Sequence, residues 1–150
     1  MIDLTTPIIP YVGTGIFKLD SSPDEIKFLL KKYSVPYDEE IKLNRYNQKD
    51  PTWIIIEVED VMEYFFAKNR LFKIILKNNF KGSLPNGINL DTTIDDAQKI
   101  DPTLTFDDWD EIFISADGYW VEDDLNTKKL SWITIFIPAL ERDDFFDYKW

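Results

Sequence analysis

The densest group of side chains able to do chemistry is the run Asp107-Asp108-Trp109-Asp110-Glu111. Carboxylates bind hard cations such as Ca²⁺, and they also serve as the acid and base of glycoside hydrolases. The run lacks the glycine that a calcium-binding loop requires, and consecutive acids on an extended segment point to opposite faces. We therefore predict no metal site. A carboxylate-dependent hydrolase, with or without a metal, remains the alternative function. The sequence does not show how far apart any two of these carboxylates lie, so it cannot exclude a working pair.

The residue types that are missing exclude most enzyme mechanisms. The chain of 150 residues contains no Cys and no His. It therefore has no thiolate or imidazole ligand for zinc, no Ser–His or Cys–His nucleophile and no histidine pH switch. Gly13-Thr14-Gly15 also lacks the Gly-Lys-Ser/Thr of a phosphate-binding loop. We predict a protein that is not an enzyme, with no catalytic residues and no cofactor.

The net charge of −11 is concentrated in one part of the chain. Twelve acids lie between Asp91 and Asp124, where Lys99 is the only base, so this segment carries the whole net charge. Such a negative potential repels nucleic acid and anionic lipid and attracts a cationic partner. We predict a basic protein partner and neither a nucleic-acid nor a membrane partner. The alternative is that the acids form an ordinary solvated surface.

Three aromatic residues lie within this acidic segment, at Trp109, Tyr119 and Trp120. Trp and Tyr are enriched in the hot spots of protein interfaces, which charged residues surround. The alternative is that Tyr119 and Trp120 simply alternate inward and outward in a strand. The predicted partner-binding residues are Asp107, Asp108, Trp109, Asp110, Glu111, Tyr119, Trp120, Glu122, Asp123 and Asp124.

Capping signals predict two helices. Ser22 is followed by Pro23 and, three residues on, by Glu25, which is the pattern of a capping box with proline at the first helical position. Apolar residues then follow at helical spacing. Thr93 begins a second, shorter helix, which ends before Pro102.

Alternating apolar segments predict the strands, and Asn69-Arg70 is expected to be a two-residue hairpin loop. The tail 143–150 is expected to be either an edge element that packs its aromatic residues or a flexible arm. The aromatic residues expected in the core are Phe28, Trp53, Phe65, Phe66, Phe72, Trp132 and Phe136. The predicted strands are 15–19, 41–46, 52–59, 62–68, 71–77, 111–115, 118–121 and 129–137.

The order of these elements occurs twice. Leu19-Asp20-Ser21-Ser22 before the first helix returns as Leu90-Asp91-Thr92-Thr93 before the second, and Arg70-Leu71 has its counterpart in Lys129-Leu130. Neither half is expected to fold alone, because each helix needs sheet to cover. We predict a single α+β domain over residues 1–150, with an antiparallel sheet and helices on one face. It would consist of two similar strand-helix-meander halves, at about 13–80 and 85–140.

The repeated unit resembles two families. A Gly-Ile strand, a Ser/Thr-capped acidic helix start and Phe65-Phe66 before Leu71 are similar to the small immunity proteins of contact-dependent growth inhibition and related polymorphic toxin systems. The helix start also resembles the Leu-Gly-Met-Thr segment of an outer-membrane assembly lipoprotein fold. Asp20 and Asp91 replace the glycine of that segment, and the chain has no cysteine for lipidation, which argues against the lipoprotein role. The resemblance spans about 15–137.

The immunity-protein resemblance implies a binding function. We expect the chain to bind and neutralise a cognate bacterial toxin C-terminal domain, a cationic nuclease, in a 1:1 complex through the acidic surface. The first residues lack the basic and apolar regions of a secretory signal, and no apolar run approaches the ~20 residues of a membrane span. We therefore expect a cytoplasmic protein.

Overall fold

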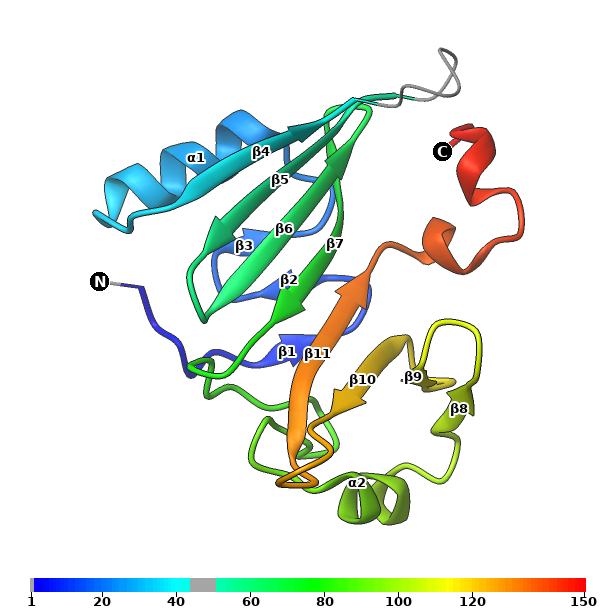
Figure 1. The fold of residues 1–150 in the computed structure, drawn as a ribbon. Coiled ribbons are helices and arrows are strands. Elements are labelled where there is room, and N and C mark those ends of the chain that lie inside the picture. The colour runs from blue at the N-terminus through cyan, green and yellow to red at the C-terminus, as the bar shows by residue number, and fades with distance from the viewer. Residues whose placement is uncertain (1, 44–50) are drawn as a thin grey trace.

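The computed structural model describes residues 2–43 and 51–150. In these residues the protein is α+β, with two α-helices and antiparallel sheets (Figure 1). The helices are α1 (Pro23–Lys32) and α2 (Ile94–Ile100), and the 3-10 helices are η1 (Pro138–Glu141) and η2 (Phe145–Asp147). The small sheet has the order β1 (Ile8–Ile9), β2 (Gly13–Thr14) and β3 (Phe17–Lys18). The large sheet has the order β4 (Asp38–Lys42), β5 (Trp53–Val58), β6 (Met62–Ala67), β7 (Arg70–Leu76), β11 (Leu130–Phe136), β10 (Tyr119–Asp123), β9 (Ile112–Ile114) and β8 (Thr105–Asp107).

Both helices begin at the residues that the capping signals predict. Ser22 Oγ accepts a hydrogen bond from Glu25 N at 3.1 Å, and Glu25 Oε2 accepts one from Ser22 N at 3.0 Å, which completes the capping box. Thr93 Oγ1 accepts the N–H of Asp96 at the start of α2. These bonds satisfy helix N–H groups that have no partner within the helix.

One face of the large sheet packs against the hydrophobic core. Tyr64, at the centre of β6, is completely buried there. Ile26 and Leu30 of α1 and Ile94 and Ala97 of α2 are buried in the same core. Figure 1 shows α1 beside β4, the small sheet behind the large one, and α2 below β10 and β11. None of the helices within residues 2–43 and 51–150 has the length and apolar composition that crossing a membrane requires.

The β6–β7 hairpin turns one residue earlier than predicted. Ala67 pairs with Arg70, so the loop is Lys68-Asn69 instead of Asn69-Arg70. Lys68 and Asn69 have φ values of 52° and 63°. Positive φ at both positions is what a two-residue hairpin loop of the I′ type needs, and the pairing register of β6 and β7 decides which two residues take it.

Two aromatic residues predicted in the core are exposed instead. Phe28 lies off the face of α1 that carries Ile26 and Leu30, and Trp132 lies on the opposite face of β11 from Ile133. The predicted strand 41–46 also differs, because β4 covers Asp38–Lys42 and residues 44–46 lie outside the described part of the chain.

The C-terminal segment packs its aromatic residues and is not a free arm. The rings of Phe145 and Trp150 stack at a centroid distance of 5.0 Å, and Trp150 Nε1 donates to the carbonyl of Phe145. Lys68 Nζ donates to the carbonyl of Tyr148 and, at 2.7 Å, to the main-chain oxygen of Trp150. These contacts hold the segment against the β6–β7 hairpin.

Candidate functional site

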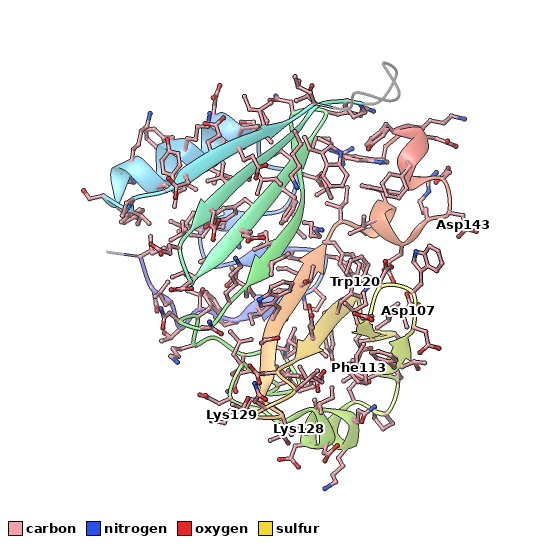
Figure 2. The ribbon with its side chains drawn as sticks, in the orientation of Figure 1. Asp107, Phe113, Trp120, Lys128, Lys129 and Asp143 are labelled. Atoms are coloured by element: carbon pink, nitrogen blue, oxygen red, sulfur yellow. The ribbon has the colours of Figure 1, made fainter. Side chains whose placement is uncertain are left out.

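The acidic run forms a tight turn between β8 and β9, and we call residues Asp107–Glu111 the acidic turn. Trp109, in the middle of this turn, is 92% exposed, the highest value among the exposed large apolar side chains of the described residues. Asp108, Asp110 and Glu111 are exposed around it. Figure 2 shows Asp107 in the part of the sheet formed by β8, β9 and β10, together with Phe113 and Trp120. The turn therefore presents a bare indole among carboxylates.

The acidic turn is held by its own hydrogen bonds. A side-chain oxygen of Asp107 accepts the N–H of Trp109 at 3.1 Å, and the carbonyl of Asp107 accepts the N–H of Glu111 at 2.8 Å. Glu111 has a φ of 56°, in the left-handed region, which lets the chain return into β9. Phe106 and Phe113 pack together just below the turn, with their ring centroids 5.0 Å apart. These bonds hold the backbone of the turn at Trp109 before any partner binds.

The other predicted acids lie on β10 and in the turn that follows it. Glu122 is half-buried, and its pKa is raised by burial and by the nearby charges of Asp123 and Glu111. Asp124 accepts the N–H groups of Thr127 and Asn126, which lower its pKa. Asp124 therefore shapes the β10–β11 turn, and Glu122 belongs to the sheet surface.

The prediction that Tyr119 contacts a partner is wrong. Tyr119 is only 1% exposed, and its hydroxyl donates to Asp101 while it accepts from Asn86 Nδ2. Burial and the hydrogen bond with Asp101 raise its pKa to about 12. Trp120, its neighbour, points to the other face of the sheet, where its ring lies 4.6 Å from that of Phe136. The alternative interpretation, in which Tyr119 and Trp120 alternate inward and outward along a strand, accounts for the positions of both residues.

Asp101, which the site prediction did not include, is the centre of a buried polar cluster. Its carboxylate accepts the hydroxyls of Ser115, Tyr119 and Thr103 and the N–H of Thr103. Burial alone would raise the pKa of Asp101, but these donors outweigh it and hold the pKa below its ordinary value. The cluster ties the end of α2 to β10 and the β9–β10 turn, and it contains no free polar group for chemistry.

The open face of the large sheet contains a second candidate group of side chains, around Lys73, which the sequence-based site prediction did not include. Lys73 on β7 lies between two direct cross-strand neighbours, Phe65 on β6 and Phe136 on β11. Its Nζ is 4.1 Å from the centroid of the Phe65 ring. A bulge leaves Phe72 without a partner on β6, and Phe72 packs against Trp53 at 5.0 Å. The signal was present in the sequence as a lysine in the middle of an otherwise apolar run, Leu71-Phe72-Lys73-Ile74-Ile75-Leu76.

Lys77 provides the contrast to Lys73. Lys77 forms ion pairs with Glu63 and, at 3.3 Å, with Glu57. Within the described residues, no carboxylate lies within ion-pair distance of Lys73 Nζ. Burial lowers the pKa of Lys73, and the more distant charges of Glu63 and Asp110 offset this only in part. Burial would also lower the pKa of Lys77, but its bonds with Glu63 and Glu57 outweigh burial and raise the pKa.

We expect Lys73 to titrate at a lower pH than Lys77. Reductive methylation with ¹³C-formaldehyde, followed by NMR titration of the dimethyl-lysine resonances, measures both side chains in one sample. Glu63→Gln should lower the pKa of both lysines, because it removes the direct partner of Lys77 and a charge that acts on Lys73. A Lys73 resonance that titrates together with or above that of Lys77 would contradict the prediction.

No three carboxylates in the described ranges converge as a metal site would require. The acidic turn and the Lys73 region each combine aromatic side chains with charged groups, as binding surfaces do. Comparisons of the chain with protein-family models, with curated proteins and with solved structures each gave no match.

Proposed function

We propose that the chain is a binding protein that neutralises a basic toxin domain, a nuclease, by docking the acidic turn onto it. The observation that carries the proposal is Trp109, which is 92% exposed in a turn whose other side chains are acids. Tryptophan is the residue most enriched in interface hot spots, and a ring of charges around it fits a partner of the opposite charge. The position of the turn within the segment that carries the whole net charge supports the same partner.

The rigidity of the acidic turn also favours binding. Association must offset the ordering of side chains and loops, and a turn already fixed by Asp107 loses less freedom on binding. Glu122 and Asp123 extend the negative surface along β10. Tyr119 has no part in this proposal, because it is buried.

The proposed mechanism of neutralisation is competition for a cationic cleft. A nuclease holds the phosphates of its substrate with Lys and Arg side chains, and carboxylates attract the same groups. A protein that covers this cleft or its edge excludes the nucleic acid both sterically and electrostatically. The same electrostatic attraction makes association fast at low salt and slow at high salt.

We also propose that the chain consists of two similar units, each with a helix followed by four strands. Equivalent positions of the two units make equivalent contacts. Leu71 N donates to Ser21 O at 2.8 Å, and Leu130 N donates to Thr92 O at 3.0 Å. Arg70 pairs with Asp20 at 2.6 Å, and Lys129 lies 3.9 Å from Asp91. The last strands of the two units, β7 and β11, are neighbours at the centre of the sheet. These matched contacts support the proposal, which leaves the acidic turn as a feature of the second unit alone.

The test uses the toxin C-terminal domain encoded by the neighbouring upstream reading frame, with association measured by surface plasmon resonance. Charge reversal of Asp108, Asp110 and Glu111 to lysine should slow association about 10- to 100-fold at low salt. Asp107 and Asp124 are left in place, because they accept backbone hydrogen bonds that shape their turns. Trp109→Ala should instead speed dissociation, since losing a hot spot costs about 2 kcal/mol or more.

The matched control reverses three exposed acids of the first half, Asp38, Glu40 and Glu59, so that the net charge changes equally. This control should bind at nearly the wild-type rate. Association of the acidic-turn variant as fast as that of the wild type at low salt would refute the proposal. A neighbouring domain that does not bind the chain, or turnover of a substrate by the chain alone, would also refute it.

A further inference from the structure

The open face of the large sheet contains a cavity of about 360 Å³ that the proposed function does not use. Trp53 and Phe72 line it from β5 and β7, and Trp120 and Trp132 line it from β10 and β11. Phe146, which is 66% exposed, belongs to its border on the C-terminal segment. Small-molecule sites are typically apolar cavities of roughly 300–1,000 Å³ with a few polar groups that fix the ligand, so this cavity suits a small ligand.

Among the described residues that line this cavity, Lys73 is the only base. Phe65 and Phe136 lie directly beside Lys73 on the two neighbouring strands. The ammonium of Lys73 lies over the ring of Phe65. Glu63 lies on β6 two residues before Phe65, the cross-strand neighbour of Lys73, but it already forms an ion pair with Lys77. A half-buried ammonium that lies against an aromatic ring and has no ionic partner among the described residues gains from a ligand carboxylate, because the pair forms in a partly dehydrated place.

The other charged groups of the cavity restrict the ligand further. Asp110 and Glu122 lie in the same lining, so the cavity as a whole does not carry positive charge. Both acids repel any anion, but they repel a dianion such as a phosphate ester about twice as strongly as a single carboxylate, for which one pair with Lys73 supplies the opposing charge. The indole walls favour a flat apolar body that can pack against them.

We propose that this cavity binds a small aromatic monocarboxylate, with the ligand carboxylate paired to Lys73 and its ring packed against the aromatic walls. The proposal does not depend on the docking of a toxin. It makes the open face of the sheet a ligand site distinct in chemistry from the exposed acidic turn, although Asp110 belongs to both.

Three probes with the same phenylpropyl body and different head groups test the proposal by isothermal titration calorimetry. These probes are 3-phenylpropanoate, 3-phenylpropanol and 3-phenylpropylamine. The carboxylate should bind at least about 10-fold more tightly than the alcohol, and the amine should bind most weakly of the three. Quenching of tryptophan fluorescence by the bound carboxylate should give the same affinity, since Trp120 and Trp132 line the cavity.

Lys73→Met should reduce binding of the carboxylate to the level of the alcohol, while binding of the alcohol itself stays unchanged. Lys73→Arg should retain the preference for the carboxylate. Lys81→Met removes an exposed lysine outside the cavity and controls for the change in net charge. Thermal unfolding of each variant checks that it is folded.

Equal or tighter binding of the alcohol or the amine would overturn the proposal. So would wild-type affinity of Lys73→Met for the carboxylate, or no binding of any probe to the wild type. The last result would be expected if a side chain of a protein partner, and not a free ligand, fills the cavity.

Discussion

Replacing Phe145 with alanine is expected to lower the free energy of unfolding by about 3–5 kcal/mol, the usual loss for truncating a buried phenylalanine. Phe145 is only 2% exposed although it lies five residues before Trp150, the last residue of the sequence. Its ring lies 5.3 Å from that of Phe72 and stacks on Trp150. The truncation would leave an unfilled space between the C-terminal segment and the open face of the sheet. Urea unfolding followed by circular dichroism measures the effect.

Phe146 provides the matched control for this prediction. It is the same residue type one position later, but it is 66% exposed. Phe146→Ala should therefore change the free energy of unfolding by no more than about 1 kcal/mol. Equal effects of the two substitutions would mean that the C-terminal segment does not dock against the sheet in solution.

The local elements of the fold could be predicted because their signals lie within a few residues. The capping box Ser22–Glu25 and the cap Thr93 each satisfy N–H groups within one turn, and both helices begin there. The alternation of strands such as β7 and β11 was predicted on the same basis. The hairpin loop was misplaced by one residue, because its position depends on the register in which β6 and β7 pair.

The arrangement of the open face could not be predicted from local signals. The bulge at Phe72, which lets both Phe72 and Lys73 line the same cavity, depends on the register between β6 and β7. The burial of Phe145 depends on a contact with β7 across more than seventy residues of sequence. Periodicity assigns residues to two faces of a strand, but it does not say which face a later segment will cover.

The candidate site shows the same division. The acidic turn was predicted as a segment, and the exposure of Trp109 agrees with a surface role. Tyr119 was assigned to that surface because composition does not reveal a buried hydrogen-bond acceptor, and Asp101 was overlooked for the same reason. Lys73 was overlooked because its significance comes from having no ionic partner in the described part of the chain, which only the pairing of Glu63 with Lys77 reveals.

Asp101→Ala is expected to lower the free energy of unfolding by about 3 kcal/mol, because a buried hydrogen-bond donor that loses its acceptor costs about 1–3 kcal/mol. The substitution would remove the common acceptor of the Ser115, Tyr119 and Thr103 hydroxyls. Asp101→Asn keeps the shape and one acceptor oxygen, so it should cost less. Asp117→Ala is the control, since Asp117 is an exposed acid near the same turn and should change stability by about 0.5 kcal/mol or less.

The pH dependence of unfolding distinguishes the charge of Asp101 from its shape. Because the folded-state pKa of Asp101 lies below its ordinary value of 3.8, its ionised form stabilises the fold at every pH above that value. The stabilisation is lost as the pH falls from the ordinary value through the folded-state pKa. The stability difference between wild type and Asp101→Asn should therefore be constant near neutral pH and shrink in this acidic range, as measured by urea unfolding over a pH series. A difference that stays constant throughout would show that the carboxylate charge of Asp101 does not hold the cluster.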